Sequence, residues 1–285
     1  MNEYGALKRV ALRHPRDAFQ SRAAIDRSWR DLGYPTAPDL DRAGAEFDDF
    51  AGILSDRGAR IDWLPDGEAL SLDSLYVRDA TLVSPRGLIA CNMGKPARAA
   101  EPALAQTYYD TLDLPLVGRI DGEGRLEGGD LVWLDEATCL VGHTYRTNEA
   151  GIAQLRALLG PDVEVVVSPL PHYRGPADVF HLMSILSPLD SDLALVYSPL
   201  MPIATRAWLL SRGLSLVEVP DEEFESMACN VLALGPRDCL MIKGNPVTQG
   251  RLEAAGCRVT TYVGREISAK GAGGPTCLTR PLVRG

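Results

Sequence analysis

The sequence predicts one α/β domain, covering residues 1–285, built from several small ββαβ-type units arranged radially. Short β-like runs recur along the whole chain, and two or three of them lie between successive helical patterns. A Rossmann-type sheet usually alternates one strand with one helix, so the pattern favours small radial units instead. No low-complexity linker divides the chain, and the units are therefore expected to share one domain.

The predicted strands are short aliphatic runs, each bounded by Gly, Pro, Asp or Ser, as strand segments usually are. They cover residues 7–12, 75–77, 88–91, 131–134, 139–142, 163–167, 193–197, 214–219, 231–234, 239–242 and 257–263. Their number and shortness indicate many small sheets and not one large sheet.

Four helices are predicted, over residues 43–57, 150–159, 203–211 and 247–255. In the first, Phe47, Phe50 and Leu54 recur at the spacing that places them on one helix face. Asn148 is expected to cap the second helix at its N-terminus. A proline opens each of the last two helices and a glycine closes it, with Gly213 at the usual position just past the C-terminus.

The composition is that of a globular protein that does not bind nucleic acid non-specifically. Apolar residues make up 46% and charged residues 24%, which excludes a disordered chain or a coiled coil. Lys and Arg number 29 against 38 Asp and Glu, giving a formal net charge of −9. Non-specific nucleic-acid binding needs a basic surface, whereas a small cationic substrate is compatible with this charge.

The sequence also gives an expectation for location. Residues 1–10 lack the apolar core of a signal peptide, and no stretch is long and apolar enough to span a membrane. Cysteines at 91, 139, 229, 239, 257 and 277 form no Cys-x-x-Cys pair and no zinc-type spacing with His. We therefore expect a cytoplasmic protein with reduced thiols and neither a metal nor another cofactor.

One cysteine stands in a setting that suits a nucleophile. Cys277 ends the run Gly271-Ala272-Gly273-Gly274-Pro275-Thr276-Cys277, whose glycines let the main chain approach a ligand closely. A flexible tail that happens to contain a cysteine is the alternative. A cysteine nucleophile usually needs a histidine, and His14, His143, His172 and His181 are available. His181 is expected at the start of a strand, where a packed core histidine is the commoner case.

Acidic residues provide the next signals. The segment Glu127-Gly128-Gly129-Asp130 places two acids around two glycines directly before a predicted strand, so a tight bend could aim Glu127 into a cleft. A hairpin turn with solvated acids is the alternative. Arg78 and Asp79 end another β-like run, where a surface ion pair would contribute at most ~1 kcal/mol.

Arginines could hold a carboxylate through a bidentate fork. Arg146 leads into the N-terminus of a predicted helix, which also favours anions, and Arg98 lies in a loop after Gly94-Lys95-Pro96-Ala97. Arg13 has a similar loop setting. Most arginines in any protein are solvated, so none of the three indicates a binding site by itself.

Taken together, these motifs resemble the guanidino-group-modifying superfamily, whose fold is the five-bladed α/β-propeller (pentein). Its members include dimethylarginine dimethylaminohydrolase, arginine deiminase and amidinotransferases. The matching motifs occur in family order: Tyr76-Val77-Arg78-Asp79, Glu127-Gly128-Gly129-Asp130, Arg146-Thr147-Asn148, His181-Leu182 and Gly273-Gly274-Pro275-Thr276-Cys277. The resemblance implies five ββαβ-type blades around a central active site.

The resemblance also implies catalytic roles. Cys277 matches the nucleophile that attacks the guanidinium carbon and forms a thiouronium-type intermediate. His181 matches the general acid and base that protonates the departing amine and then activates water. Glu127 matches the acid that orients this histidine and holds the substrate cation. A cationic substrate and a protonated histidine should favour the thiolate, and histidine suits proton transfer near pH 7.

Substrate-binding residues follow from the same resemblance. Asp79 matches the carboxylate that grips the guanidinium nitrogens, and Arg78 beside it is expected in the same site. Arg98 and Arg146 match a pair that binds the α-carboxylate of the substrate. Asp73 falls where relatives place a polar group near the amino end of the substrate. The expected partner is thus a small guanidino amino acid, and a homo-oligomer is possible.

The substrate itself stays open between two forms of arginine. Arginine deiminases carry Leu-Asp after the catalytic histidine, whereas this chain has Met183 at the Asp position. If this thioether lines the pocket, it favours Nω-methylated arginine, which would give citrulline and a methylamine. The Arg78-Asp79 pair is instead the deiminase-like form, although the chain is too short for the inserted helical domain of that family.

Three further alternatives concern function and access. Unsubstituted arginine could be hydrolysed, or an acceptor amine could replace water, as in an amidinotransferase. The chain could also be a non-catalytic pentein that only binds a partner, although Cys277, His181 and Glu127 together argue against this. Residues 21–41, which contain Gly33, are a candidate lid over the site.

Overall fold

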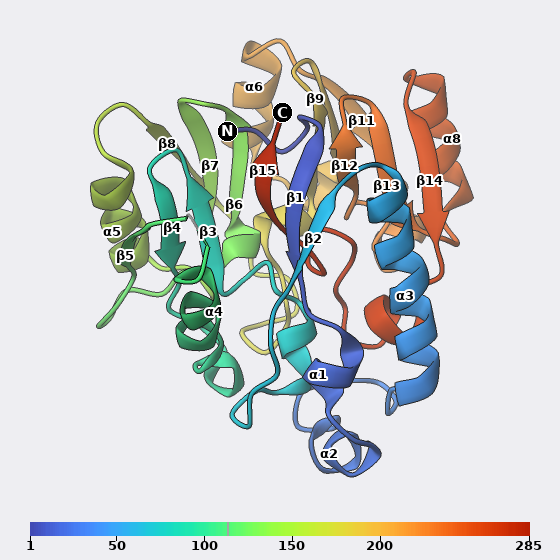
Figure 1. Cartoon of the computed structure of the whole chain (residues 1–285). Helices are drawn as coiled ribbons and strands as arrows, with labels where there is room; N and C mark the ends of the chain where they lie inside the picture. Colours follow the sequence, from blue (N-terminus) through green and yellow to red (C-terminus); the bar gives the residue numbers. More distant parts are fainter. Residues whose placement is uncertain (113) are drawn as a thin grey trace.

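The computed structural model describes residues 1–112 and 114–285, and in these residues the strands form five three-stranded sheets. The sheets lie side by side around a common centre, with helices on the outside (Figure 1). The strands are β1 (Leu7–Leu12), β2 (Arg60–Trp63), β3 (Thr81–Ser84), β4 (Gly87–Ala90), β5 (Leu116–Arg119), β6 (Leu131–Asp135), β7 (Thr138–His143), β8 (Glu164–Pro169), β9 (Leu186–Asp190), β10 (Leu193–Val196), β11 (Ser215–Glu218), β12 (Leu232–Gly235), β13 (Asp238–Ile242), β14 (Arg258–Tyr262) and β15 (Arg280–Arg284).

Helices connect the strands of each sheet and cover its outer side. The α-helices are α1 (Pro15–Phe19), α2 (Arg22–Ser28), α3 (Leu40–Asp56), α4 (Glu101–Tyr109), α5 (Glu149–Leu159), α6 (Ile203–Ser211), α7 (Asp221–Phe224) and α8 (Pro246–Ala254). Short 3₁₀ turns precede several strands, among them η1 (Leu72–Leu75), η3 (Gly128–Asp130) and η4 (Leu182–Ser184).

Every sheet repeats one connection pattern. The middle strand pairs antiparallel with the first strand and parallel with the third, as β4 does with β3 and β5. A tight turn can join an antiparallel pair, whereas a parallel pair needs a crossover, and here the crossover carries a helix. Sheets β6–β8, β9–β11 and β12–β14 follow the same rule. The predicted ββαβ-type units and the five-bladed fold are therefore confirmed.

The first sheet is assembled from both ends of the described chain. Strand β1 pairs antiparallel with β15 and parallel with β2, and α1 to α3 form the crossover. The two termini consequently lie close together at the upper edge in Figure 1, at the opposite end of the molecule from α2. This pairing closes the ring of sheets.

In each sheet the third strand is the least buried. Strands β3 and β12 are buried at every position, whereas β5 and β11 have no buried position. The first strands therefore line the centre of the molecule, and the third strands lie outside. The end at which a first strand begins is thus the place where side chains from all five sheets can meet.

Most predicted elements are confirmed with shifts of a few residues at their ends. The four predicted helices appear as α3, α5, α6 and α8, and Asn148 caps α5 by accepting a hydrogen bond from Gly151 N. The strand predicted over 75–77 is wrong: Leu75 ends the turn η1, and Val77 is buried by packing around the turn, not within a sheet.

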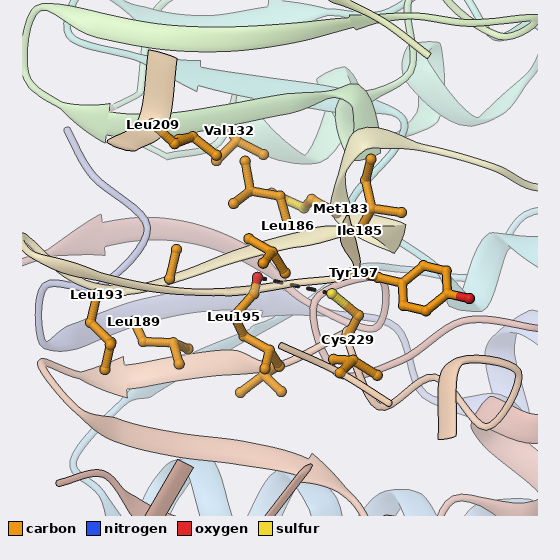
Figure 2. Close-up of a cluster of buried hydrophobic side chains, with 14 of the residues drawn as sticks. Val132, Met183, Ile185, Leu186, Leu189, Leu193, Leu195, Tyr197, Leu209 and Cys229 are labelled. Carbon is orange, nitrogen blue, oxygen red and sulfur yellow. Dashed lines mark hydrogen bonds between the residues drawn. The ribbon is translucent and has the colours of Figure 1, made fainter. Parts of the chain in front are cut away.

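The largest apolar cluster lies between the sheets β6–β8, β9–β11 and β12–β14, and Figure 2 shows part of it. Leu195 in β10 is fully buried there, and its carbonyl oxygen lies 3.9 Å from the Cys229 sulfur. Met183 in η4 belongs to the same cluster, so the apolar cluster extends as far as η4. Among the described helices, none combines the length and apolarity needed to cross a lipid bilayer.

We expect Leu195→Ala to lower the free energy of unfolding by about 2–5 kcal/mol, because it leaves a cavity in a close-packed core. Urea unfolding followed by circular dichroism measures this change. Leu210→Ala is the matched control, because Leu210 in α6 is 46% exposed and its truncation should change stability by about 0.5 kcal/mol or less. Equal losses in both variants would contradict the packing described here.

Candidate active site

Five polar residues stand just before the five first strands. Asp79 precedes β3, Glu127 precedes η3 and β6, His181 precedes η4 and β9, Asn230 precedes β12, and Cys277 precedes β15. Since these strands begin at the same end of the molecule, the repeat brings residues from distant parts of the sequence to one place. Asp79, His181 and Cys277 line one cavity there, together with Arg98 and Arg146.

Glu127 and His181 form a buried pair at the centre of this group. Glu127 Oε2 lies 2.8 Å from His181 Nε2, and neither side chain is more than 4% exposed. The other oxygen of Glu127 accepts hydrogen bonds from Gly94 N and Lys95 N, at 2.9 and 3.1 Å. Fixed donors on both oxygens hold the carboxylate, and the carboxylate in turn fixes the imidazole plane.

Asp79 lies on the other side of the imidazole. Its Oδ1 accepts a hydrogen bond from Gly129 N at 3.0 Å and lies 3.8 Å from His181 Nδ1. A Cβ at Gly129 would overlap with His181 Nδ1 and crowd Asp79 Oδ1 at 2.9 Å. Only glycine therefore allows the two acids and the histidine to come this close. This explains one of the two glycines in the Glu127–Asp130 motif.

Asp130 ties three sequence motifs together. It is fully buried and accepts hydrogen bonds from the Thr144 and Thr147 hydroxyls, both at 2.7 Å, and from Leu182 N at 2.9 Å. The two threonines bracket the turn that carries Arg146, and Leu182 follows His181. One buried carboxylate thus positions both the histidine and an arginine of the site.

Cys277 is held by its own loop and by Asn230. Asn230 Oδ1 accepts hydrogen bonds from Thr276 N and Oγ1, at 3.0 and 2.9 Å, and Asn230 Nδ2 lies 3.5 Å from the Cys277 sulfur. A Cβ at Gly274 would overlap with Asn230 Oδ1, so the glycine permits this approach. Cys277 is half-buried, while the other described cysteines are buried. It is the cysteine that a substrate in the cavity can reach.

The electrostatics of the site favour a charged histidine and a neutral thiol in the absence of substrate. Burial opposes the charged form of His181, but the charges of Asp79 and Asp130 and the hydrogen bond to Glu127 raise its pKa to about 9. Burial likewise opposes ionised Glu127, yet its bond to His181 lowers the pKa to about 2. Burial and the charge of Asp79 raise the pKa of Cys277.

The cavity in front of these residues has a volume of about 160 Å³ and two chemically different ends. Asp79, His181 and Cys277 lie at one end. Asp73 lies elsewhere in the wall, where its Oδ2 is 2.5 Å from Lys95 Nζ. Residues 32–35 of the predicted lid form part of the wall, and Lys95 Nζ also bonds to Leu32 O at 3.0 Å.

The two predicted carboxylate-binding arginines both line the cavity, but they are not equally free. Arg98 uses four of its N–H donors on Asp79, Glu101 and the carbonyl of Tyr76. Arg146 contacts Glu127 only through Nη1, at 3.3 and 3.5 Å. Its Nε and Nη2 have no hydrogen-bond partner among the described residues. Arg146 is therefore better placed to receive a carboxylate.

Two expectations about the site are wrong. Arg78 does not line the catalytic cavity: its guanidinium contacts the carboxylate of Glu3 and donates to Thr276 O at 3.1 Å. His181 does not begin a strand, because it caps the turn η4, and β9 starts only at Leu186. In both cases long-range contacts, which a local pattern does not contain, determine the conformation.

Met183 lies behind the histidine and not beside Asp79. It lines a second cavity of about 120 Å³ that shares His181 and Cys277 with the first. Asn230 also lines this second cavity, and sequence reasoning missed it, as it missed the Lys95–Asp73 pair. Asn230 could have been found from its position, because it stands directly before a first strand, as the other four residues do.

Asp79, Glu127 and His181 offer three atoms of metal-ligand type within 4.8 Å of one another. The carboxylates are already neutralised, since Arg98 contacts Asp79 and Arg146 contacts Glu127. A metal would need a neutral imidazole, whereas the raised pKa of His181 keeps it protonated below about pH 9. The donor set suits an organic cation better than a metal ion.

The five-bladed fold and a cysteine beside a histidine and buried acids define the class, a pentein of the guanidino-group-modifying superfamily. A family model described as eukaryotic N,N dimethylarginine dimethylhydrolase matches residues 17–284. The chain belongs to this family of enzymes that hydrolyse amidino groups.

Relatives with known sequences include an uncharacterised protein and deiminases. The protein YkgA of Bacillus subtilis is 27% identical over 213 residues, which cover 75% of this chain and 71% of YkgA. The arginine deiminase of Mycobacterium marinum is 28% identical over 245 residues, covering 74% of this chain. This chain spans 60% of the length of that deiminase.

Solved structures share the fold. Dimethylarginine dimethylaminohydrolase of Pseudomonas aeruginosa, a mutant in complex with citrulline, superposes with a TM-score of 0.75 at 23% identity, covering 96% of this chain and 98% of that chain. The N-terminal domain of ArgZ, a cyanobacterial arginine dihydrolase bound to substrate, gives a TM-score of 0.80 at 18% identity, covering 97% and 98%. At these identities the likeness shows the fold alone.

The raised pKa of Cys277 predicts slow alkylation by iodoacetamide at pH 7 without substrate, because the thiolate is the reactive form. The rate should rise steadily with pH to beyond pH 9, the ordinary value for this thiol. Mass spectrometry of the Cys277 peptide measures it, with Cys277→Ser as the unlabelled control. A rate that reaches its plateau below pH 8 would contradict the electrostatics described here.

Proposed function

We propose that this protein hydrolyses Nω-methylated L-arginine to L-citrulline and a methylamine or dimethylamine, with Cys277 as the nucleophile. The observation that carries the proposal is the placement of Cys277 and His181 between an acid-lined cavity and a second cavity whose wall includes methionine and aromatic side chains. The first cavity suits the charged end and plane of a guanidino amino acid, and the second suits methyl groups on the leaving nitrogen.

Binding would use charge complementarity. Asp79 would accept hydrogen bonds from the guanidinium nitrogens, since charge-assisted bonds of this kind are short and directional. Arg146 would bind the α-carboxylate through its free N–H groups, with Arg98 contributing its remaining donor. Asp73, held by Lys95 Nζ, would receive the α-amino group. One face of the flat cation is then presented to the sulfur, which lowers the entropic part of the barrier.

Substrate binding would also activate the thiol. In the empty site, burial and Asp79 raise the pKa of Cys277, so the thiol is protonated at neutral pH. A guanidinium beside the sulfur has the opposite effect, because a nearby positive charge stabilises the thiolate. The proton leaves to solvent as the substrate binds. Such an enzyme keeps its nucleophile unreactive until the correct cation arrives.

The chemistry then runs in two halves. Cys277 sulfur attacks the guanidinium carbon, and His181 donates its proton to the methylated nitrogen, so a neutral amine departs and a thiouronium remains. His181, now neutral, removes a proton from water as the water oxygen bonds to the same carbon. The carbon–sulfur bond breaks and restores the thiolate, the proton left on the hydroxyl oxygen passes to solvent, and citrulline is released.

The second cavity bears on the choice of substrate. Met183, Met227, Phe180 and Phe224 line part of it, so thioether and aromatic groups form one part of its wall, beside polar side chains such as Ser184 and Asn230. Methyl groups on a leaving nitrogen gain contacts in such surroundings, whereas an unsubstituted NH₂ would lose its hydrogen bonds to water there. This favours the methylated substrate over arginine itself.

Hydrolysis of unsubstituted arginine is the second candidate. The relatives named arginine deiminase and the structural likeness to an arginine dihydrolase support it. Transfer of the amidino group to an amine is a further alternative, since an amidinotransferase of Microseira wollei shares the fold at a TM-score of 0.78. A non-catalytic binding role is disfavoured by the cavity that exposes Cys277 beside His181.

A colorimetric citrulline assay tests the proposal. We expect the purified protein to form citrulline from asymmetric dimethylarginine and monomethylarginine faster than from arginine, and Cys277→Ser to form none. Ornithine formed from arginine would indicate the dihydrolase reaction instead. Absence of citrulline from every methylated substrate, with the wild-type chain folded, would reject the proposal.

Met183→Gln should reduce the preference for dimethylarginine over arginine, measured as the ratio of the two kcat/KM values, by about tenfold or more. The change places a polar amide where methyl groups are expected. Met201→Gln is the matched control, because Met201 is buried in the same apolar cluster but does not line the cavity. A ratio that changes equally in both variants would show that Met183 does not select the substrate.

A further inference from the structure

A third cavity lies beside the two termini, and residues of β3, β6 and β15 line it. It has a volume of about 130 Å³, and its charged side chains are Arg78, Arg280, Arg284, Glu3 and Glu136. The two termini, which lie beside this third cavity, are in the upper part of Figure 1. The catalytic cavity is bordered by the segment after α2, and α2 lies at the lower end. The function proposed above does not involve the third cavity.

The buried side chains that line this cavity carry more positive than negative charge, and Met1 and Gly285 line it as well. Arg78 is 1% exposed and Arg280 4% exposed, and the buried acid among them, Glu3, contacts Arg78 at 3.3 Å. Glu136 is exposed at the rim. In the described part of the chain, no ion pair joins Arg280 or Arg284 to a carboxylate of another side chain. Buried charge is expensive unless it is paired.

Donor atoms in this cavity also lack partners. Arg280 Nε and Arg284 Nε and Nη2 are buried without a hydrogen bond to any described residue. The other nitrogens are used on main-chain carbonyls: Arg280 Nη2 donates to Arg78 O, and Arg284 Nη1 donates to Gly5 O and Ala233 O at 2.7 and 2.8 Å. These bonds fix the two guanidinium groups and leave their remaining N–H groups available.

We propose that this cavity is a binding site for a small inorganic anion, held by Arg280, Arg284 and Arg78. Guanidinium groups bind oxyanions through paired N–H donors, so a phosphate-type anion matches the free groups, and chloride could use the same donors. A cavity needs roughly 10–15 Å³ to hold one water, so this one has room for a polyatomic anion. Burial, with the positive charge of Arg78, lowers the pKa of Arg280 and Arg284 to about 10, and a bound anion would act in the opposite direction.

Gly128 explains why the anion site and the catalytic cavity stay separate. A Cβ at Gly128 would overlap with Arg78 O and crowd Arg280 Nη2 at 2.7 Å, whereas its neighbour Gly129 packs against His181 and Asp79. The two glycines thus form a thin wall with arginines on one side and the catalytic acids on the other. The proposed anion acts as a structural ligand, and its binding is independent of the reaction.

The experiment measures anion binding on the full chain. Thermal unfolding is followed in HEPES with sodium gluconate at constant ionic strength, while sodium phosphate or sodium chloride replaces gluconate. Arg284→Gln removes two of the free donors. Asn2→Asp places a carboxylate in the lining of the cavity, at a residue that already accepts hydrogen bonds from Tyr4 N and Gly5 N. Arg22→Gln, at an exposed arginine of α2, is the matched charge control.

We expect at least one of the two anions to raise the Tm of the wild type in a saturable way, by about 4–8 °C at a hundredfold excess over Kd. The rise should be kept in Arg22→Gln and weakened severalfold in Asn2→Asp and Arg284→Gln. Isothermal titration with the same anion should give one site per chain.

Two results would overturn the proposal. The first is a Tm that rises linearly with anion concentration and equally in all four proteins, because exclusion of salt from the surface acts in this way. The second is a wild type that responds to neither anion. If Arg284→Gln does not fold, Asn2→Asp decides alone, since it keeps the existing hydrogen-bond acceptor and adds charge only where the anion would bind.

Discussion

The buried pair of Glu127 and His181 is the interaction on which the rest of the site depends. Neither group reaches bulk water, so each charge has to be matched by a neighbour. Glu127 is matched by Arg146 and by two main-chain N–H groups, and Asp79 on the far side of the ring is matched by Arg98. The scattered charged motifs are therefore parts of one neutralising network, and none of them is stable in this setting without the others.

The repeated blade brings residues that are distant in the sequence to one place. Each blade begins with a short turn at the centre of the ring, and each turn contributes one polar side chain before its first strand starts. Asn230 and Asp79 take the same position in their blades as Cys277 and His181 do in theirs. Asn230 holds the backbone at Thr276, and Asp79 lies beside His181. The same backbone arrangement thus brings two carboxylates, an imidazole, an amide and a thiol to one place.

Sequence reasoning succeeded where local pattern decides conformation. Aliphatic runs gave most strands, and periodic apolar residues with capping signals gave four helices. It missed β2, β3, β5 and β15, of which β2 and β5 are half-exposed outer strands with little apolar character. It also misassigned residues 75–77, whose apolar side chains pack around a turn. In the site, the family motifs located Cys277, His181, Glu127 and Asp79. The partners of Arg78 could not be foreseen, because Glu3 and Thr276 lie 75 and 198 residues away.

The closure of the ring by β1 and β15 has a consequence for how the molecule forms. Contacts between segments this far apart in sequence carry a large loop-closure cost, and chains rich in them fold slowly. During synthesis, β1 cannot form its antiparallel pairing until β15 has been made. Cys277 lies directly before β15. Cys277 is therefore among the last of the site residues to take its place, and a nascent chain on the ribosome has no complete site until β15 is paired.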